Sequence, residues 1–405
     1  DIFIAGQGSA VSGDDDWGVL MTGGLVYSGA GKVSIYGRAP ASCIYNWHRG
    51  IATGWGARTA IVSESTAEDA VYLYGNTASC NNTGSVYASA VESHDAYTSI
   101  ATPNGGGIKI YGIQGNASYS ADNDRQSNAV QLRYVNLISN SGPIHIHAVN
   151  ATTASSYNIR FAQDSNSRRS IGALATNWST GYDAYPTIAA VPSTSNVTLK
   201  ANTMKPGWAD FRTSGHLVFE PDTTFVESEP IYLSSDWGVQ FPLKVASFNV
   251  GKPASGSTNQ TKSNLDLLAI SSVGPVNAYG GTITYEGNIS SDQEVNLLGS
   301  SSMTVGVQVS AGSGGVSIES ADALTVNSPI TSAGRVSLES TGLSTNLTLG
   351  ANITVSGAGS NLLLKSKSNV ILSTAGVNLQ TGGKSNGAGG RIVIWADSDA
   401  SGQGY

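Results

Sequence analysis

The densest run of potential metal ligands in the sequence is formed by Asp14, Asp15 and Asp16. Calcium binds several carboxylate oxygens at once, so three consecutive aspartates could contribute to a calcium site. The alternative is a solvated turn ahead of a strand that starts at Trp17. Because the G-G-x-G-x-D-x-U-x array of calcium-binding solenoids does not occur, the sequence favours the turn and supports calcium only weakly.

Two pairs of polar residues have the i, i+2 spacing that places side chains on one face of a strand. Asp397 and Asp399 follow the predicted strand RIVIWA, where they form either a carboxylate pair or, as we favour, a turn stabilised by aspartate. His145 and His147 alternate with isoleucines in PIHIHA. Two imidazoles are fewer than the three or four ligands of a zinc site, so we expect an exposed polar pair.

The two cysteines, Cys43 and Cys80, follow similar strands at nearly the same distance, six residues after Gly37 and five after Gly75. Stacked copies of one strand would bring these positions close together. We therefore expect either a disulfide between neighbouring loops, which fits an exported protein, or two free thiols if the loops diverge. The disulfide is the favoured alternative.

Aromatic residues recur at one position of these strands. Tyr36, Tyr74 and Tyr111 each stand immediately before the glycine that ends a strand, and His147 takes that place in a fourth copy. If the copies stack in parallel, the three tyrosines form an outward aromatic ladder. The ladder either stiffens the stack and covers the sheet, or forms an adhesive face for another subunit or for sugar.

Tryptophans occur in the long segments between the strands. Trp47, Trp55 and Trp178 lie in such insertions, where they either contact a ligand or pack in small cores beneath the loops. Neither a G-x-S-x-G elbow nor a phosphate-binding loop occurs, so the sequence indicates no nucleophilic or nucleotide chemistry.

The composition limits the classes of partner that the protein can bind. Lys and Arg total 21 and Asp and Glu total 28, a net charge of −7, which argues against nucleic acid because binding phosphates requires a basic surface. No run of ~18 apolar residues occurs, so we expect no membrane span. The 49 glycines and the charged fraction of 12% are unusual for a helical enzyme.

The elements that must position these side chains are short repeated strands. GKVSIYG ends at Gly37, AVYLYG at Gly75, GIKIYG at Gly112 and PIHIHA at Ala148, 36–38 residues apart. Later strands of the same type, such as GGVSIES and GRVSLES, recur at steps of 20 and 21 residues. Apolar and polar residues alternate within each copy, and this period of two predicts strands.

The repetition predicts an all-β chain folded as a parallel β-helix, or β-solenoid. One short strand cannot bury its apolar face alone, whereas a stack of rungs buries a continuous core. A β-sandwich would not repeat one strand, and a propeller would keep one period, so both fit less well. We predict residues 1–230 to be solenoid with long aromatic-bearing insertions and residues 231–405 to be compact Gly/Ser/Asn-rich rungs.

Three segments resemble the filamentous-haemagglutinin-type secreted repeat proteins of Gram-negative bacteria: residues 1–37, 248–291 and 361–404. The first contains repeats of the form G-V-x-I-x-G, and the last ends in a Trp-x-Asp-x-Asp turn at Trp395. The resemblance implies a right-handed parallel β-helix, export across the outer membrane, and a role in adhesion or surface structure. Because the chain starts at Asp1 without Met, we expect a mature piece of a longer protein.

The leading functional prediction is a structural or adhesive module in a surface fibre, secreted or exposed on a Gram-negative cell surface. We expect it to self-associate into a filament, to bind a carbohydrate or cell-surface ligand, and to require no cofactor. The alternative is a polysaccharide lyase or hydrolase, because such enzymes use parallel β-helices. Such an enzyme needs clustered acidic and basic side chains. Several residues could supply them, but their spacing singles out no particular set: Asp122, Asp124, Asp164, Arg125, Arg133, Arg168 and Arg169.

Overall fold

The structure of the chain is a computed structural model. It describes residues 1–9, 15–41, 43, 47–80, 87–94, 96–115, 127–150, 157–161, 169–177, 187–227, 231–233, 239–241, 244–255, 259–382 and 389–400. Regular structure in these residues consists of β-strands, and none of them forms a helix long and apolar enough to cross a membrane. The strands form two compact units, one of residues 1–223 and 236–242 and one of residues 224–235 and 243–405.

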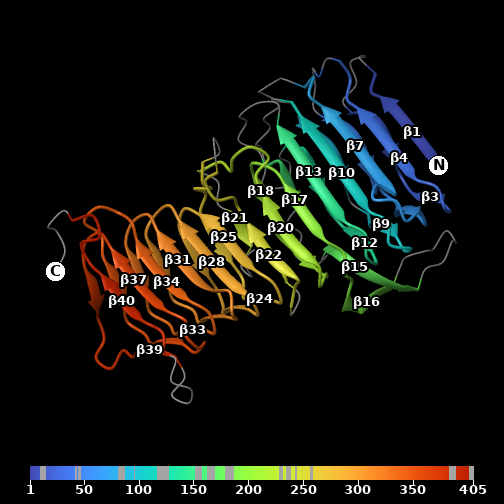
Figure 1. The fold of residues 1–405 in the computed structure, drawn as a ribbon. Coiled ribbons are helices and arrows are strands. Elements are labelled where there is room, and N and C mark those ends of the chain that lie inside the picture. Colours follow the sequence, from blue (N-terminus) through green and yellow to red (C-terminus); the bar gives the residue numbers. More distant parts are fainter. Residues whose placement is uncertain are drawn as a thin grey trace. The chain divides into compact units, whose positions relative to one another are not determined.

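In the first unit, each rung contributes a strand to each of three sheets, and equivalent strands of successive rungs pair in parallel (Figure 1). The first sheet has the order β1 (Ile2–Gln7), β4 (Val33–Arg38), β7 (Val71–Thr77), β10 (Ile108–Gln114), β13 (Ile144–Asn150), β17 (Val197–Lys200) and β20 (His216–Glu220).

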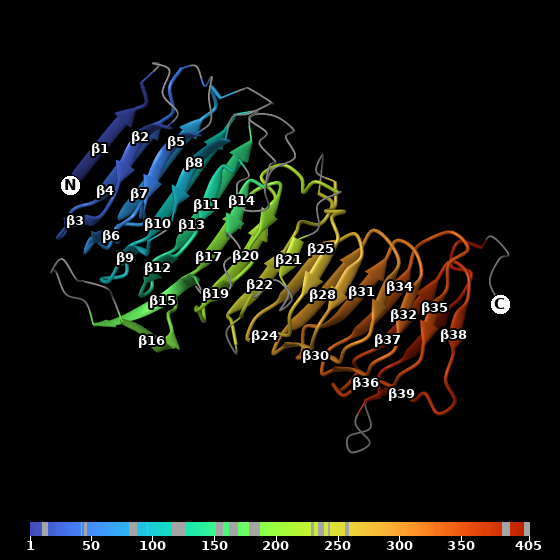
Figure 2. The same ribbon diagram turned by 180° about the vertical axis from the view of Figure 1, so that it is seen from behind.

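The other two sheets of the first unit are visible from behind (Figure 2). The second sheet contains β2 (Asp15–Met21), β5 (Trp47–Thr53), β8 (Tyr87–Ser93), β11 (Val130–Leu132), β14 (Ile159–Phe161) and β18 (Met204–Lys205). The third contains β3 (Gly24–Ser28), β6 (Thr59–Ser63), β9 (Thr98–Thr102), β12 (Val135–Ser139), β15 (Arg169–Asn177) and β16 (Thr187–Pro192). The strand β19 (Ala209–Phe211) pairs with β15 in parallel, whereas β16 pairs with β15 antiparallel.

The second unit repeats this arrangement with shorter strands. One sheet contains β22 (Ser247–Val250), β25 (Val276–Gly280), β28 (Glu294–Gly299), β31 (Gly315–Ser320), β34 (Val336–Ser340), β37 (Leu362–Ser366) and β40 (Ile392–Trp395). A second contains β24 (Ile270–Ser272), β27 (Ile289–Ser291), β30 (Val309–Ala311), β33 (Ile330–Ser332), β36 (Ile353–Val355) and β39 (Leu379–Thr381). The remaining strands are β21 (Ile231–Leu233), β23 (Leu265–Leu267), β26 (Ile283–Tyr285), β29 (Met303–Val305), β32 (Leu324–Val326), β35 (Leu347–Leu349) and β38 (Val370–Leu372).

This topology confirms the predicted all-β parallel β-helix. Equivalent positions of successive rungs face each other in register, so Val33 pairs with Val71 and Val71 with Ile108. These side chains point into the solenoid and are completely buried, while their neighbours along each strand point outward. Because the strands pair in parallel, successive side chains of each apolar column lie about 4.8 Å apart along the stack.

The glycine that ends so many of these strands also has a physical reason. Gly37, Gly75 and Gly112 occupy one inward-facing column of the first sheet. A Cβ atom at Gly37 would collide with the carbonyl oxygen of Gly50, and one at Gly75 with the carbonyl oxygen of Ala90. The backbone of the second sheet approaches so closely here that glycine is required at these three positions.

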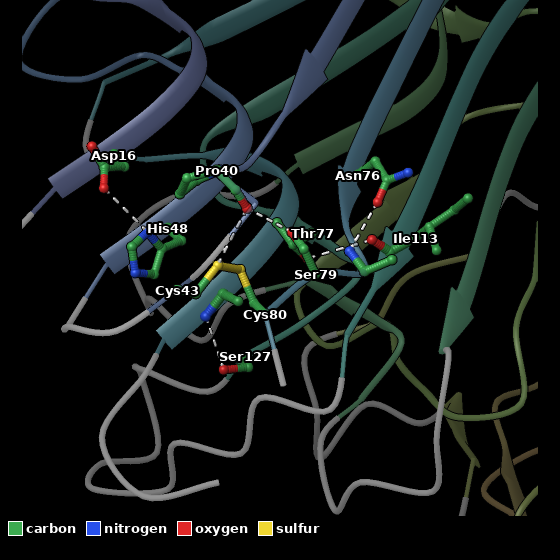
Figure 3. The surroundings of a disulfide bond; sticks show 12 residues. Asp16, Pro40, Cys43, His48, Asn76, Thr77, Ser79, Cys80, Ile113 and Ser127 are labelled. Atoms are coloured by element: carbon green, nitrogen blue, oxygen red, sulfur yellow. Dashed lines mark hydrogen bonds and ion pairs between the residues drawn. A yellow bond between two sulfur atoms is a disulfide. The ribbon is translucent and has the colours of Figure 1, made fainter. Parts of the chain in front are cut away.

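A disulfide joins Cys43 and Cys80, whose Cα atoms lie 4.9 Å apart (Figure 3). Both sulfur-bearing residues are buried in a small cluster with Ala39 and Ala88. The bond connects residues 37 positions apart in the sequence, in neighbouring rungs. In the chain-entropy model, a loop of this length contributes about 4 kcal/mol by restricting the unfolded chain.

We predict that Gly75→Ala lowers the free energy of unfolding by about 2–3 kcal/mol, because the added methyl group meets backbone that cannot rotate away. Urea denaturation followed by circular dichroism measures this. Gly29→Ala is the matched control, since a Cβ atom at Gly29 meets nothing within 4 Å. Equal stabilities of the two variants would show that the approach of the two sheets is not restrictive.

Candidate functional site

The outer face of the first sheet in the first unit carries a continuous aromatic column. Tyr36, Tyr74, Tyr111 and His147 are register partners on successive rungs. The ring centroids are 5.8 Å apart for Tyr36 and Tyr74, 5.6 Å for Tyr74 and Tyr111, and 4.8 Å for Tyr111 and His147. The structure therefore brings the three tyrosines of the predicted ladder together.

The geometry of the rings indicates what the column can do. The rings of Tyr74 and Tyr111 are stacked, with an interplanar angle of 25°. The other neighbouring rings are inclined to each other, by 39° for Tyr36 and Tyr74 and by 62° for Tyr111 and His147, so they do not cover one another's faces completely. Tyr72 joins the column from the neighbouring outward row, with its ring at 77° to that of Tyr36. The aromatic surface is therefore two rows wide at β7.

The two histidines of PIHIHA are not an exposed pair, and that prediction was wrong. His145 and His147 are both half-buried. The Nε2 atom of His147 lies 2.8 Å from the Oδ1 atom of Asp222, and the Nζ atom of Lys200 lies 3.1 Å from the same oxygen. A carboxylate 75 residues away in the sequence therefore orients this imidazole.

Electrostatics at this end of the column follow from partial burial. Burial opposes ionisation of Asp222, but hydrogen bonds from His147 and Lys200 outweigh it and leave the pKa of Asp222 below its ordinary value. Burial lowers the pKa of His145, and the positive charge of Lys109 lowers it further. At neutral pH, His145 is therefore an uncharged imidazole that can both donate and accept hydrogen bonds.

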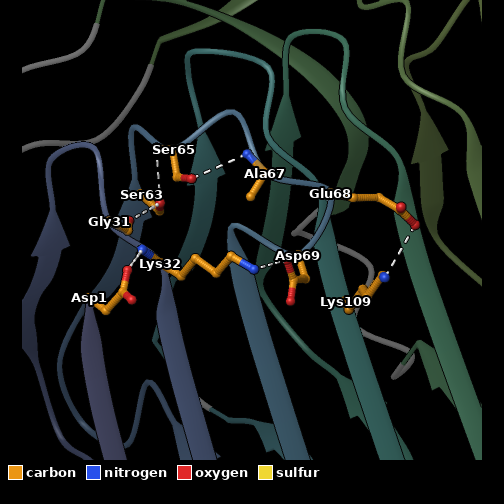
Figure 4. Close-up of polar contacts among 9 residues, drawn as sticks. All are labelled: Asp1, Gly31, Lys32, Ser63, Ser65, Ala67, Glu68, Asp69 and Lys109. Carbon is orange, nitrogen blue, oxygen red and sulfur yellow. Dashed lines mark hydrogen bonds and ion pairs between the residues drawn. The ribbon is translucent and has the colours of Figure 1, made fainter.

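A groove of about 480 Å³ lies between these two outward rows. Its lining combines aromatic rings, the hydroxyl group of Thr198 and several titratable side chains: Tyr72, Tyr111, Lys109, His145, His147, Lys200 and Glu220. Each lysine of the groove is paired, Lys200 with Asp222 and Lys109 with Glu68, the latter at 3.2 Å (Figure 4). The groove thus offers many hydrogen-bonding groups without excess positive charge.

Sequence patterns had indicated only part of this groove. Tyr111 and His147 were found because each precedes the residue that ends its strand, and His145 because it alternates with isoleucines. Tyr72 and Lys109 were missed, although both occupy the outward position two residues earlier and are register partners. Glu220 and Asp222 carried no local signal, because β20 departs from the Tyr-Gly pattern.

The structure describes only part of the predicted calcium site. Asp14 lies outside the described residues, and of the Asp15 side chain nothing is described. Asp16 lies with its Oδ2 atom 3.6 Å from Nδ1 of His48. The described residues contain no group of three or more side chains arranged to hold a metal ion, so calcium binding stays a prediction.

Other predicted sites are also described only in part. Asp397 follows β40 in a turn, where its amide donates to the carbonyl oxygen of Ser368 at 2.9 Å. The carbonyl oxygen of Asp397 accepts a hydrogen bond from Ala400 across this turn. Most residues named for the enzyme hypothesis lie outside the described residues: Asp122, Asp124, Arg125, Asp164 and Arg168. The amide of Arg133 bonds to Ser93, and nothing is described of the Arg169 side chain.

Trp47 and Trp55, predicted together in one insertion, lie in β5 and directly after it and are partly buried against the side chain of Arg49. The guanidinium carbon of Arg49 lies 4.7 Å from the ring centre of Trp55 and 5.2 Å from that of Trp47. Arg49 is completely buried, and its Nε atom lies 2.5 Å from Oε2 of Glu92. This buried ion pair was not foreseen, because Glu92 belongs to β8 of the next rung. The two tryptophans, in contrast, lie close to Arg49 in the sequence. Trp178 lies outside the described residues.

No protein-family model, curated protein or solved structure matches the chain. The volume of the groove lies within the range of small-molecule sites, ~300–1,000 Å³, and its aromatic rings and convergent polar groups are typical of such sites. It can bind a polar ring compound through both apolar contact and hydrogen bonds.

The corresponding outward row of the second unit contains three charged residues as well as the aromatic residues Tyr279 and Trp395. Glu319 pairs in register with Glu339, and Glu339 with Lys365. Lys365 and Glu339 form an ion pair. Burial raises the pKa of Glu319, and the negative charge of Glu339 raises it further. The ionised form of Glu319 is therefore disfavoured in the folded state.

We predict that Glu319→Gln stabilises the protein at pH 7 by about 0.5 kcal/mol, because it removes a like charge directly opposite Glu339. A raised folded-state pKa means that stability is full below the unfolded pKa and is lost as pH rises through the folded pKa. At pH 3 the variant and the parent should therefore unfold at the same urea concentration. Glu339→Gln is the control: it removes the same repulsion but also the partner of Lys365, so it should stabilise less than Glu319→Gln. A destabilising Glu319→Gln at pH 7 would contradict this account.

Proposed function

We propose that the chain is an extracellular structural and adhesive β-solenoid whose first unit binds carbohydrate on the outer face of its first sheet. The groove along β7, β10, β13, β17 and β20 is the observation that carries the proposal. It lies on the flat side of a rigid stack, where a long ligand can rest without any loop rearrangement.

Carbohydrate fits the groove better than other ligand classes. A sugar ring has an apolar face of C–H groups and a rim of hydroxyls. Tyr72 and Tyr111 offer apolar ring surface, while His145 and Thr198 offer hydrogen-bonding groups beside it. Because the lysines of the groove are paired with carboxylates, a polyanion would meet as much repulsion as attraction.

The extracellular setting is supported by the disulfide. Cys43 and Cys80 are bonded, and disulfides persist in oxidising compartments. Membership of the filamentous-haemagglutinin-type proteins and a place on a Gram-negative cell surface remain part of the proposal. They rest on the repeated strands of residues 1–37, 248–291 and 361–404.

We predict that the protein binds neutral oligosaccharides of at least four sugars on a glycan array, and that Thr198→Met weakens the best binder about tenfold. The methionine side chain is larger and has no hydroxyl group, so it narrows the groove and removes a hydrogen bond. Isothermal titration with the best array hit measures the change in Kd.

Ser317→Met is the matched control, because Ser317 is an exposed outward residue of β31 in the second unit. Unchanged binding by Thr198→Met, or loss in both variants, would count against the groove. The same mixtures are assayed for new reducing ends. Release of reducing ends that Thr198→Met slows would favour the lyase or hydrolase hypothesis over adhesion.

A second proposal, self-association by rung stacking, rests on a different observation. Leu362 and Leu364 of β37 are completely buried, but their register partners Ile392 and Ile394 of β40 are 42% and 54% exposed. These isoleucines belong to the inward columns of the solenoid. We propose that a rung of a second copy covers them, because exposed strand edges pair readily with further strands.

We predict that the 405-residue chain associates as its concentration rises, and that Ile394→Lys reduces this association. A charge in an inward column cannot be buried against another rung without a large cost. Sedimentation velocity over a range of concentrations measures the mass. Val393→Lys is the control, since Val393 points outward on the same strand. A chain that sediments as a monomer at every concentration contradicts the proposal.

A further inference from the structure

A second hollow lies on the same outer face, beyond the groove. Its volume is about 420 Å³, and its lining comes from β1, β4 and β7. Tyr36 and Tyr74 form one side, and Gln7 and Arg38 form the other. Gln7 and Arg38 are register partners, and both side chains are exposed. The hollow therefore contains one amide, one guanidinium and the edges of two tyrosine rings.

Arg38 differs from the other cations of this sheet. The strands of the first sheet in the first unit carry three lysine or arginine residues: Arg38, Lys109 and Lys200. Lys109 is paired with Glu68 and Lys200 with Asp222. The Nζ atom of Lys32, just before β4, lies 2.6 Å from the Oδ1 atom of Asp69 (Figure 4). Among the described residues, Arg38 alone of these four has no ion-pair partner.

We propose that Arg38 binds a carboxylate or sulfate group of the same carbohydrate chain whose neutral rings occupy the groove. This inference rests on the proposed function and specifies its ligand as a glycan with at least one anionic sugar. A guanidinium can donate two parallel hydrogen bonds to either group, and the amide of Gln7 can donate another. Neither contact requires Arg38 to leave an existing carboxylate.

The two hollows are placed so that one chain can reach both. They meet at β7, where Tyr72 lines the groove and Tyr74 lines the second hollow. The two ring centroids are 6.5 Å apart. From Arg38 on β4 to Lys200 on β17 there are four rung steps, or about 19 Å at ~4.8 Å per step. The ligand therefore runs along the solenoid axis, and short oligosaccharides fill only one hollow.

The test uses an array on which each backbone is present in neutral, carboxylated and sulfated forms and in several lengths. We expect long acidic forms to bind best, and Arg38→Met to weaken them about tenfold, to the level of the neutral forms. Raising the salt concentration should weaken binding of the acidic forms to the parent and have little effect on Arg38→Met. Neutral forms should bind the variant and the parent equally. The carboxylated and sulfated arms identify which anion is preferred.

Lys32→Met is the matched control, since it removes a positive charge outside both hollows. It should leave binding of the acidic forms unchanged, and melting temperatures report that all variants fold. If the neutral forms bind as tightly as the acidic ones, or Arg38→Met changes nothing, the inference is overturned while the proposed function stands. If no glycan binds the parent protein, the proposed function itself fails.

Discussion

Backbone hydrogen bonding between successive rungs, in fixed parallel register, is the interaction on which every other feature of this protein depends. Because each strand pairs with its equivalent in the next rung, a residue type repeated in the sequence becomes a column in space. Inward columns are filled by Val, Ile and Leu, which bury the apolar face that a single short strand could not bury. Gly37, Gly75 and Gly112 form the column where the second sheet approaches.

The same register decides what happens on the outside of the stack. Like residues meet like residues, which suits tyrosine rings and amides but is unfavourable for like charges. In the second unit, Asn249, Asn277 and Asn296 form a ladder of side-chain hydrogen bonds at 2.6 and 2.9 Å. Several charged residues are instead placed so that opposite signs face each other across rungs, as Lys32 and Asp69 do, whereas Glu319 faces Glu339. The first sheet thus carries hydrogen-bonding groups with little free charge.

A solenoid of this kind makes a binding surface from its scaffold rather than from loops. The groove and the neighbouring hollow are lined by outward residues of paired strands, whose positions are held by the same hydrogen bonds that hold the core. His147 is oriented by Asp222, and the tyrosines by one another. Such a surface is rigid, so little conformational entropy is lost when an extended ligand is bound.

The sequence by itself determined the alternation within each strand, the parallel stacking of copies and the three-tyrosine column, because these depend on local periodicity and on spacing between repeats. For Cys43 and Cys80 it left two alternatives, and the structure joins them. Only the tertiary structure decided that Asp222 reaches His147 and that the buried Arg49 pairs with Glu92. Insertions of unequal length separate these partners, so neither repeat spacing nor local pattern specifies which residues meet.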